Sequence, residues 1–413
     1  MFNQRVLFRA KKFVFLVIPS AALFIILYSD WTVSRASVWS LRFGDEVLDE
    51  GPVVRPKLGR LQLHSVRTAL ALDELDSPEK LSPLIPPINV TEKERITWFR
   101  EKLPEFDIFN NDNLTSQFHT RVRDFLNYDC ELRFFMTWIL PATLFGRREL
   151  LALESLFRAH PNGCLVMVSS MLDSRRGLKL LEPMLNRGLK LLAVTPDLDY
   201  LFTNTPAEAW YSEIKTGNRD PGGIPLAQNL SNLIRLAILY KYGGVYLDVD
   251  FIVLRDFSQL RNAIGAQSID PESRDWTRIN NAVMVFDANH PLLFKFIQEF
   301  ALTFDGNKWG HNGPYLVSRV IRRVRGREGY NFTVLPPTAF YPVDWTRIRR
   351  LFKKPESRDE RRWVEAKLLQ LSKNTYGVHL WNKQSRGMEI EEGSVMETLI
   401  ADHCLICRHA YSS

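Results

Sequence analysis

Two acidic residues, Asp248 and Asp250, are the clearest candidates for chemistry in this sequence. They stand between a double glycine with a short apolar run, 243–247, and a second apolar run, 251–254. This pattern predicts a buried strand, along which side chains alternate, so that both carboxylates face the same way with Cα atoms about 7 Å apart. Such a pair would repel unless a cation joined it. A hard divalent ion satisfies both carboxylates and leaves positions for phosphate oxygens, so we expect a metal site rather than a surface turn.

The residues before the double glycine predict the helix that positions this pair. From Leu230 to Tyr240 almost every position is apolar, so the helix should be buried on most sides. Ser231, Asn232 and Arg235 are the polar exceptions and lie close together on one face. A buried arginine needs an anionic partner. A structural salt bridge and a bound ligand are equally open as that partner.

Upstream of this helix, short apolar segments alternate with amphipathic ones. The alternation predicts an α/β layer with a largely parallel central sheet flanked by helices. Ligands of such sheets gather at the carboxyl ends of the strands. The predicted strands are 133–138, 164–169 and 189–195, and the predicted helices are 147–160 and 178–187.

Composition narrows the class of protein. The chain has 413 residues, of which 45% are hydrophobic and 24% charged, so wholesale disorder is excluded. The net charge is +7, but the basic residues are scattered rather than gathered into one block. We therefore expect no nucleic-acid partner.

The N-terminus carries the pattern of a membrane anchor. Four basic residues precede an uncharged run from Phe13 to Tyr28. This run is long for the core of a cleaved signal peptide, and 34–36 is a poor cleavage site, so an uncleaved single span is favoured. The basic flank predicts a cytoplasmic tail and a luminal remainder. The expected organisation is a tail at 1–12, a transmembrane signal anchor at 13–29, a luminal stem at 30–128 and a folded domain at 129–413.

A luminal location has consequences for sequons and cysteines. Four sequons begin at Asn89, Asn113, Asn229 and Asn331, and they permit N-glycosylation. Four cysteines in an oxidising lumen are expected to pair, with three connectivities open. The Cys404-x-x-Cys407 pair also allows a zinc or redox site, although structural disulfides are favoured. The cysteines are Cys130, Cys164, Cys404 and Cys407.

The segment SNLIRLAILYK followed by YGGVYLDVDFIVL resembles the donor-site signature of a known family. This is the lactosylceramide 4-alpha-galactosyltransferase and alpha-1,4-N-acetylglucosaminyltransferase family, whose members carry a DXD sugar-binding motif. Further motifs stand in the family's order. They are 280–286, 290–292, 309–314 and 379–382. The resemblance covers residues 130–407 and is closest to the family's uncharacterised plant branch.

The resemblance implies a GT-A fold at 129–413, with the aspartates leaving a strand near the centre of a nucleotide-binding sheet. It implies a retaining hexosyltransferase that moves galactose or N-acetylglucosamine from a UDP-sugar to a glycan or glycolipid in the Golgi lumen. Asp248 and Asp250 would be catalytic and would hold Mn²⁺ or Mg²⁺, with His379 as third ligand. The residues implied at the donor are Arg235, Asn232, Tyr246, Asn281, Trp381 and Asn382; those implied on the acceptor or sugar side are His311, Asn312 and Gly313.

One position departs from the family's pattern. Many relatives carry aspartate where this chain has Asn232, so an amide replaces a carboxylate expected to grip sugar hydroxyls. This departure keeps a non-catalytic, luminal sugar-binding protein of the same fold as an alternative. A phosphatase of the haloacid-dehalogenase type is a second alternative, because it also carries Asp-x-Asp after an apolar strand. It is disfavoured because α/β sequence precedes Asp248 and no later acidic motif follows.

Overall fold

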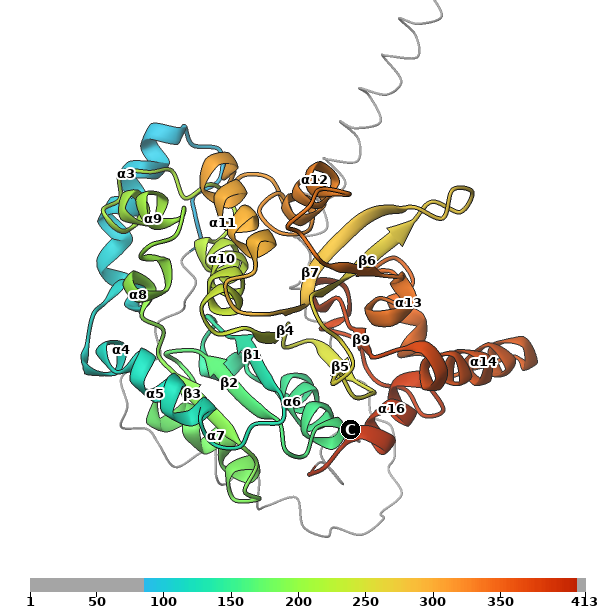
Figure 1. The fold of residues 1–413 in the computed structure, drawn as a ribbon. Helices are drawn as coiled ribbons and strands as arrows, with labels where there is room; N and C mark the ends of the chain where they lie inside the picture. The colour runs from blue at the N-terminus through green and yellow to red at the C-terminus, as the bar shows by residue number, and fades with distance from the viewer. Residues whose placement is uncertain (1–84, 407–413) are drawn as a thin grey trace, which may run out of the picture. The chain divides into compact units, whose positions relative to one another are not determined.

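The computed structural model describes residues 85–406, which fold as an α/β unit (Figure 1). Seven strands form one sheet in the order β3-β2-β1-β4-β7-β6-β8. They are β1 (Arg133–Thr137), β2 (Cys164–Val168), β3 (Leu191–Val194), β4 (Gly244–Leu247), β6 (Ala263–Ile269), β7 (Trp276–Phe286) and β8 (Thr333–Leu335). A separate two-stranded sheet is formed by β5 (Phe251–Val253) and β9 (Gly377–His379).

The main sheet has a parallel half and a mixed half. Strands β3, β2, β1 and β4 pair in parallel, whereas β7 runs antiparallel to both β4 and β6, and β8 runs parallel to β6. All five residues of β2 are buried, as expected of a parallel strand covered on both faces. The α/β prediction with a largely parallel sheet is confirmed, and the three strands predicted upstream correspond to β1, β2 and β3.

Helices cover both faces of the main sheet (Figure 1). The α-helices are α3 (Glu92–Lys102), α4 (Asn113–Ser116), α5 (Phe118–Leu126), α6 (Arg147–Ala159), α7 (Arg175–Leu185), α8 (Leu198–Phe202), α9 (Glu208–Lys215), α10 (Leu226–Tyr242), α11 (Pro291–Thr303), α12 (Pro314–Val324), α13 (Pro337–Phe340), α14 (Arg358–Asn374), α15 (Asn382–Ser385) and α16 (Val395–His403). The 3₁₀ helices are η1 (Leu103–Glu105), η2 (Asp107–Phe109), η3 (Ala142–Leu144) and η4 (Ile348–Leu351). Strand β1 shows how the two faces are filled: Phe135 packs in a hydrophobic cluster with residues of α10, and Phe134 packs in a second cluster with residues of α6.

The helix predicted over 230–240 is the buried core of α10. Of its seventeen residues, twelve are buried, including Asn232 and Arg235. The helix ends at the double glycine, where Gly243 has φ 63° and Gly244 has φ 117°. A Cβ at Gly244 would lie 2.5 Å from the carbonyl oxygen of Arg133 in β1. Glycine therefore lets β4 turn sharply out of α10 and pair closely with β1.

The small sheet joins two distant parts of the chain. Phe251 pairs with His379 and Val253 pairs with Gly377, in antiparallel register. The middle residues of its two strands, Ile252 and Val378, belong to a third hydrophobic cluster. This cluster includes Val364 of α14 and Leu399 of α16. This pairing carries the C-terminal segment to the end of β4, where Asp248 and Asp250 follow.

The predicted boundary between stem and domain at residue 129 falls inside the folded unit. Residues 92–126, which the sequence assigned to the stem, form α3, α4 and α5 with two 3₁₀ helices. Phe99, Phe118 and Val122 are at most 1% exposed and belong to the main core. The predicted tail, the anchor at 13–29 and the first part of the stem lie outside the described residues. Within residues 85–406, no helix is both long and apolar enough to cross a bilayer.

The structure also bears on the cysteines and sequons. Cys130 and Cys164 form a disulfide with Cα atoms 5.4 Å apart. Cys407 lies outside the described residues. Asn229 is 4% exposed on α10 and accepts a hydrogen bond from Asn312 at 2.9 Å, so its sequon is not available for glycosylation in the folded protein. The sequons at Asn89, Asn113 and Asn331 have exposed asparagines.

Replacing Gly244 with alanine tests the α10–β4 turn. We expect Gly244→Ala to lower the free energy of unfolding by about 2–4 kcal/mol, because strain at positive φ adds to a clash with the β1 backbone. Gly326→Ala is the matched control: its φ is 74°, but nothing lies within 4 Å of the added Cβ. Urea denaturation of both variants measures the difference. Equal losses of unfolding free energy in the two variants would show that the close approach to β1 contributes nothing to the effect of Gly244→Ala.

Candidate metal centre and substrate cavity

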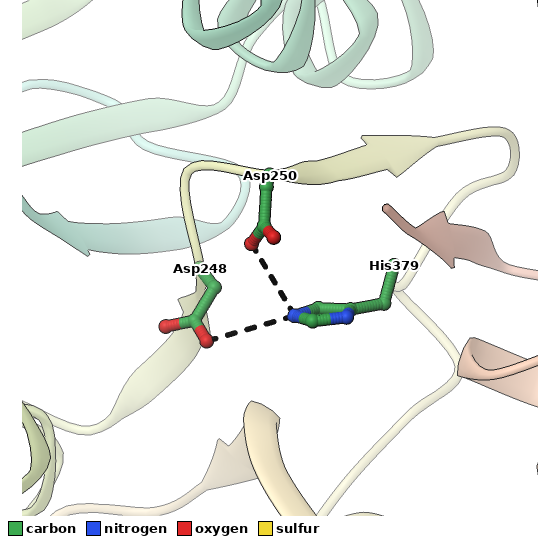
Figure 2. Close-up of side chains that lie close together, drawn as sticks. All are labelled: Asp248, Asp250 and His379. Atoms are coloured by element: carbon green, nitrogen blue, oxygen red, sulfur yellow. Dashed lines mark ion pairs between the residues drawn. The ribbon is translucent and has the colours of Figure 1, made fainter. Parts of the chain in front are cut away.

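Asp248 and Asp250 lie on the turn between β4 and β5 rather than within one strand. Strand β4 ends at Leu247, and the backbone N–H of Phe251 donates to the Asp248 carbonyl at 3.1 Å. The prediction of a continuous strand through both aspartates is therefore wrong. The chain changes its pairing partner here, from β7 before the turn to β9 after it. The turn nevertheless brings both carboxylates together (Figure 2).

His379, the last residue of β9, approaches both aspartates (Figure 2). Its Nε2 is 3.3 Å from Asp250 Oδ1 and 3.8 Å from Asp248 Oδ2. One donor atom from each of the three residues lies within 4.8 Å of the others. Two carboxylate oxygens and one imidazole nitrogen at this spacing are a set of donors that a divalent cation can join. We call these three residues the triad.

The charges of the triad depend on one another. Burial opposes the charged form of His379, but Asp250 and then Asp248 outweigh it and raise the pKa of the imidazole to about 9. Burial likewise opposes the charged form of Asp250, but His379 and the N–H of Asn382 hold the pKa of that carboxyl below its usual value. A protonated His379 therefore offsets part of the negative charge of the two carboxylates. A metal ion would have to displace that proton.

Arg235 on α10 has Asp248 as its anionic partner. Its Nη1 is 2.9 Å from Asp248 Oδ1, while the other oxygen of Asp248 faces His379. The guanidinium also lies over the ring of Tyr246, with Cζ 4.6 Å from the centroid. Burial opposes the charge, but Asp248 more than offsets this and raises the pKa of Arg235. Of the two partners left open for this arginine, the structural salt bridge is present.

Asn232 and Asn281 form an amide pair beside Arg235. Asn281 Nδ2 donates to Asn232 Oδ1 at 2.8 Å, and Asn232 Nδ2 donates to the carbonyl of Gln228 at 3.0 Å. Arg235 Nη1 donates to the backbone carbonyl of Asn281 at 2.9 Å. The amide at Asn232 is thus hydrogen-bonded through both its oxygen and its nitrogen. A carboxylate at this position would lose the bond to Gln228, because it has no donor.

The backbone at Trp381 and Asn382 places a hydrogen-bond donor on the triad. Trp381 has a left-handed conformation, with φ 54°, and its Nε1 donates to the carbonyl of Val343 at 2.9 Å. This conformation turns the chain so that the N–H of Asn382 donates to Asp250 Oδ2 at 2.8 Å. A non-glycine residue at positive φ costs free energy, and such strain concentrates at functional sites.

The triad opens into a cavity of about 950 Å³. Its walls come from the end of β1, from α10, from the loop before α12 and from α15. The predicted site residues that line it are Asn232, Arg235, Asp248, Asp250, Asn281, Asn312, His379, Trp381 and Asn382. The structure therefore brings together most of the residues that the sequence singled out.

Three predicted residues are not among those that line the cavity. Tyr246 is 1% exposed and lies beneath Arg235, where its hydroxyl donates to Asp248 at 3.2 Å. The Nε2 of His311 is 2.8 Å from the carbonyl of Thr303, and neither His311 nor Gly313 is among the cavity-lining residues. The placement of His311 and Gly313 on the acceptor side has no direct support in this geometry.

Sequence reasoning missed one residue behind the cavity wall and one segment of the wall itself. Glu149 is 3% exposed; it accepts the N–H of Gly146 at 3.0 Å and a bond from Asn382 Nδ2 at 3.4 Å, so it ties α6 to α15. A glutamate three residues after a helix N-cap can be recognised in the sequence as a capping residue. Its contact with Asn382 cannot be inferred from the sequence. The segment 137–140 also lines the cavity, and its place at the carboxyl end of β1 could have indicated this.

The residues present fit a divalent cation. The donors are two carboxylates, which hard cations prefer, and a histidine nitrogen, which manganese accepts. Next to them, Asn382 Oδ1 is buried without a hydrogen-bond partner among the described residues. Such an orphaned acceptor is costly unless a ligand or bound water satisfies it.

Two family models match the chain. Residues 146–270 match a glycosyltransferase sugar-binding region containing the DXD motif, and residues 285–411 match the alpha 1,4-glycosyltransferase conserved region. Two solved structures show a distant likeness. The PaToxG glycosyltransferase has TM-score 0.36 and 16% identity, over 56% of this chain and 80% of its own. The glycosyltransferase GlyE of Streptococcus pneumoniae has TM-score 0.37 and 10% identity, over 67% and 61%.

Curated proteins resemble the chain more closely. Lactosylceramide 4-alpha-galactosyltransferase of Mus musculus is 34% identical over 271 residues, which cover 61% of this chain and 68% of the relative. An uncharacterized protein of Arabidopsis thaliana is 31% identical over 67% of this chain and 42% of its own. Alpha-1,4-N-acetylglucosaminyltransferase of Homo sapiens is 28% identical over 50% and 58%. The chain thus belongs to the alpha 1,4-glycosyltransferase family that includes lactosylceramide 4-alpha-galactosyltransferase.

Proposed function

We propose that this protein is a retaining hexosyltransferase with a GT-A-like fold. It transfers galactose or N-acetylglucosamine from a UDP-sugar to a hydroxyl group of a glycan or glycolipid. The observation that carries this proposal is the convergence of Asp248, Asp250 and His379 on the wall of one large cavity. At about 950 Å³ the cavity lies at the upper end of small-molecule sites, so it has room for a nucleotide sugar and part of an acceptor.

The triad would hold Mn²⁺ or Mg²⁺. Bound there, the ion would act as a Lewis acid on the donor's diphosphate, the group on which negative charge develops. Arg235 is not free for that task, because Asp248 already neutralises it. Lys383 and Arg386 line the same cavity close to Asn382 and would help to offset charge on the leaving group.

Transfer exchanges one bond at the anomeric carbon for another. The bond from that carbon to the phosphate oxygen breaks, and a bond to the acceptor oxygen forms on the same face of the sugar. The acceptor's hydroxyl proton passes to the departing phosphate oxygen. Among the described residues that line the cavity, Asp248 and Asp250 are the only carboxylates, and both belong to the triad. This supports front-face attack over a covalent intermediate on an enzyme carboxylate.

We place the protein in the Golgi membrane as a single-pass type II protein with a luminal catalytic domain. Two features support this placement. The basic N-terminal flank before the uncharged run 13–28 predicts the orientation. The Cys130–Cys164 disulfide is typical of an oxidising compartment.

Replacing Asp250 with asparagine tests the proposed transferase. The full-length chain in detergent is given UDP-galactose or UDP-N-acetylglucosamine with Mn²⁺, and release of UDP is measured. We expect Asp250→Asn to reduce this release by about a hundredfold or more, because a charged ligand is lost from the triad. Asp359→Asn is the control, since that side chain is 91% exposed on α14 and should leave release unchanged. Full release by Asp250→Asn would refute the assignment, and tight UDP binding with no release by the unaltered protein would favour the non-catalytic alternative.

The acidity of His379 predicts how metal binding depends on pH. Below about pH 9 the imidazole is mostly protonated, so a bound ion must displace one proton. The affinity for Mn²⁺ should therefore rise about tenfold for each pH unit between pH 6 and 8. Calorimetric titration at three pH values measures this slope. His379→Gln removes the titrating group and should flatten the dependence; an unchanged slope in that variant would rule out His379 as the site of proton release.

A further inference from the structure

Aromatic side chains gather at the mouth of the cavity. Among the described residues, four aromatic side chains are conspicuously exposed, and three of these line this one cavity. Trp309 is 54% exposed, Trp345 is 49% exposed and Tyr315 is 43% exposed. The fourth, Tyr128, lies outside it. Exposed tryptophan is costly to keep in water, so its concentration at one opening indicates a binding surface.

The three rings come from separate parts of the chain. Trp309 lies in the loop before α12, Tyr315 is in the first turn of α12, and Trp345 lies between α13 and η4. Folding therefore assembles this group, and no single amphipathic segment accounts for it. We call Trp309, Tyr315 and Trp345 the aromatic rim.

Short series of contacts link the rim to the triad. Lys383 Nζ lies 3.8 Å from the ring centroid of Trp309, and Lys383 directly follows Asn382, whose N–H donates to Asp250. On the other side, Trp345 is two residues from Val343, whose carbonyl accepts the indole N–H of Trp381. Two of the three rim residues, Trp309 and Trp345, are thus linked through neighbouring residues to the triad.

Polar groups accompany the rings. Arg278 Cζ lies 3.8 Å from the centroid of Tyr315. Asn280 Nδ2 donates to Gln267 Oε1 at 3.0 Å, and both of these amides line the cavity. Aromatic faces suit the C–H face of a pyranose ring, while amide and cationic groups suit its hydroxyls. This combination matches a saccharide better than a lipid chain, which offers nothing to the polar groups.

The nucleotide has a different place available. Ligands of α/β sheets bind at the carboxyl ends of parallel strands. In this cavity that place is the segment 137–140, which begins with the last residue of β1. The rim comes instead from residues beyond β7. The nucleotide and the aromatic rim are thus assigned to different walls of the cavity.

We propose that the aromatic rim is the acceptor subsite and that it takes a saccharide of two or more pyranose rings. The acceptor is then recognised through its sugars, whatever lipid or protein carries them. This inference rests on the proposed transferase function, which it deepens by naming the class of acceptor.

Binding of free disaccharides tests the rim without any turnover. Methyl β-lactoside, N-acetyllactosamine and cellobiose are titrated separately into the full-length chain in detergent, with the heat of binding as the readout. At least one of them should bind saturably. Trp309→Ala and Trp345→Ala should each weaken that binding by about tenfold, whereas Trp345→Phe, which keeps an aromatic face, should bind nearly as the unaltered protein does. Tyr128→Ala is the matched control and should bind normally.

Donor measurements separate this inference from the proposed function. Binding of UDP with Mn²⁺ should be the same in Trp309→Ala, Trp345→Ala and the unaltered protein. If neither variant weakens saccharide binding, or if none of the three disaccharides binds the unaltered protein, the acceptor assignment is overturned. If the variants lose UDP binding instead, the rim belongs to the nucleotide and the assignment is likewise overturned. Absence of UDP binding by the unaltered protein would contradict the proposed function but not the saccharide result.

Discussion

Two neighbouring carboxylates, Asp250 buried and Asp248 partly buried, are the constraint on which this structure depends. Like charges in a buried place repel, and each must be balanced by a partner. Asp248 divides its two oxygens between Arg235 and His379, and Asp250 shares its own between His379 and the N–H of Asn382. The partners come from α10, β9 and the start of α15, so the elements around the cavity meet because they supply these charges and hydrogen bonds.

Backbone geometry serves the same constraint. The double glycine lets β4 leave α10 at the angle that delivers Asp248, and the left-handed Trp381 directs the next N–H onto Asp250. Glycine adopts positive φ readily, whereas Trp381 does so at a conformational cost. The amide pair of Asn232 and Asn281 extends this network away from the charges. Because both ends of the Asn232 amide are hydrogen-bonded, asparagine is fitted to its place in this chain.

Much of the fold could be predicted from the sequence, since apolar runs marked the parallel strands and the buried helix α10. The sequence could not show that β4 ends before Asp248 and Asp250. The chain changes its pairing partner there from β7 to β9, and β9 lies far along the chain. The helices at 92–126 were missed because they are short and separated by irregular turns, although Phe118, Val122 and Leu126 keep helical spacing. Contacts such as that of Glu149 with Asn382, and the gathering of the rim, arise only in three dimensions.

The pairing of β5 with β9 has a consequence for how the protein matures. Asp250 and Asn382 are 132 positions apart, and the histidine of the triad arrives on the later strand. During synthesis the aspartates emerge long before their counter-charge, and loop closure over so great a separation is entropically slow. A nascent chain therefore cannot complete this site until His379 has been synthesised and β9 has paired with β5.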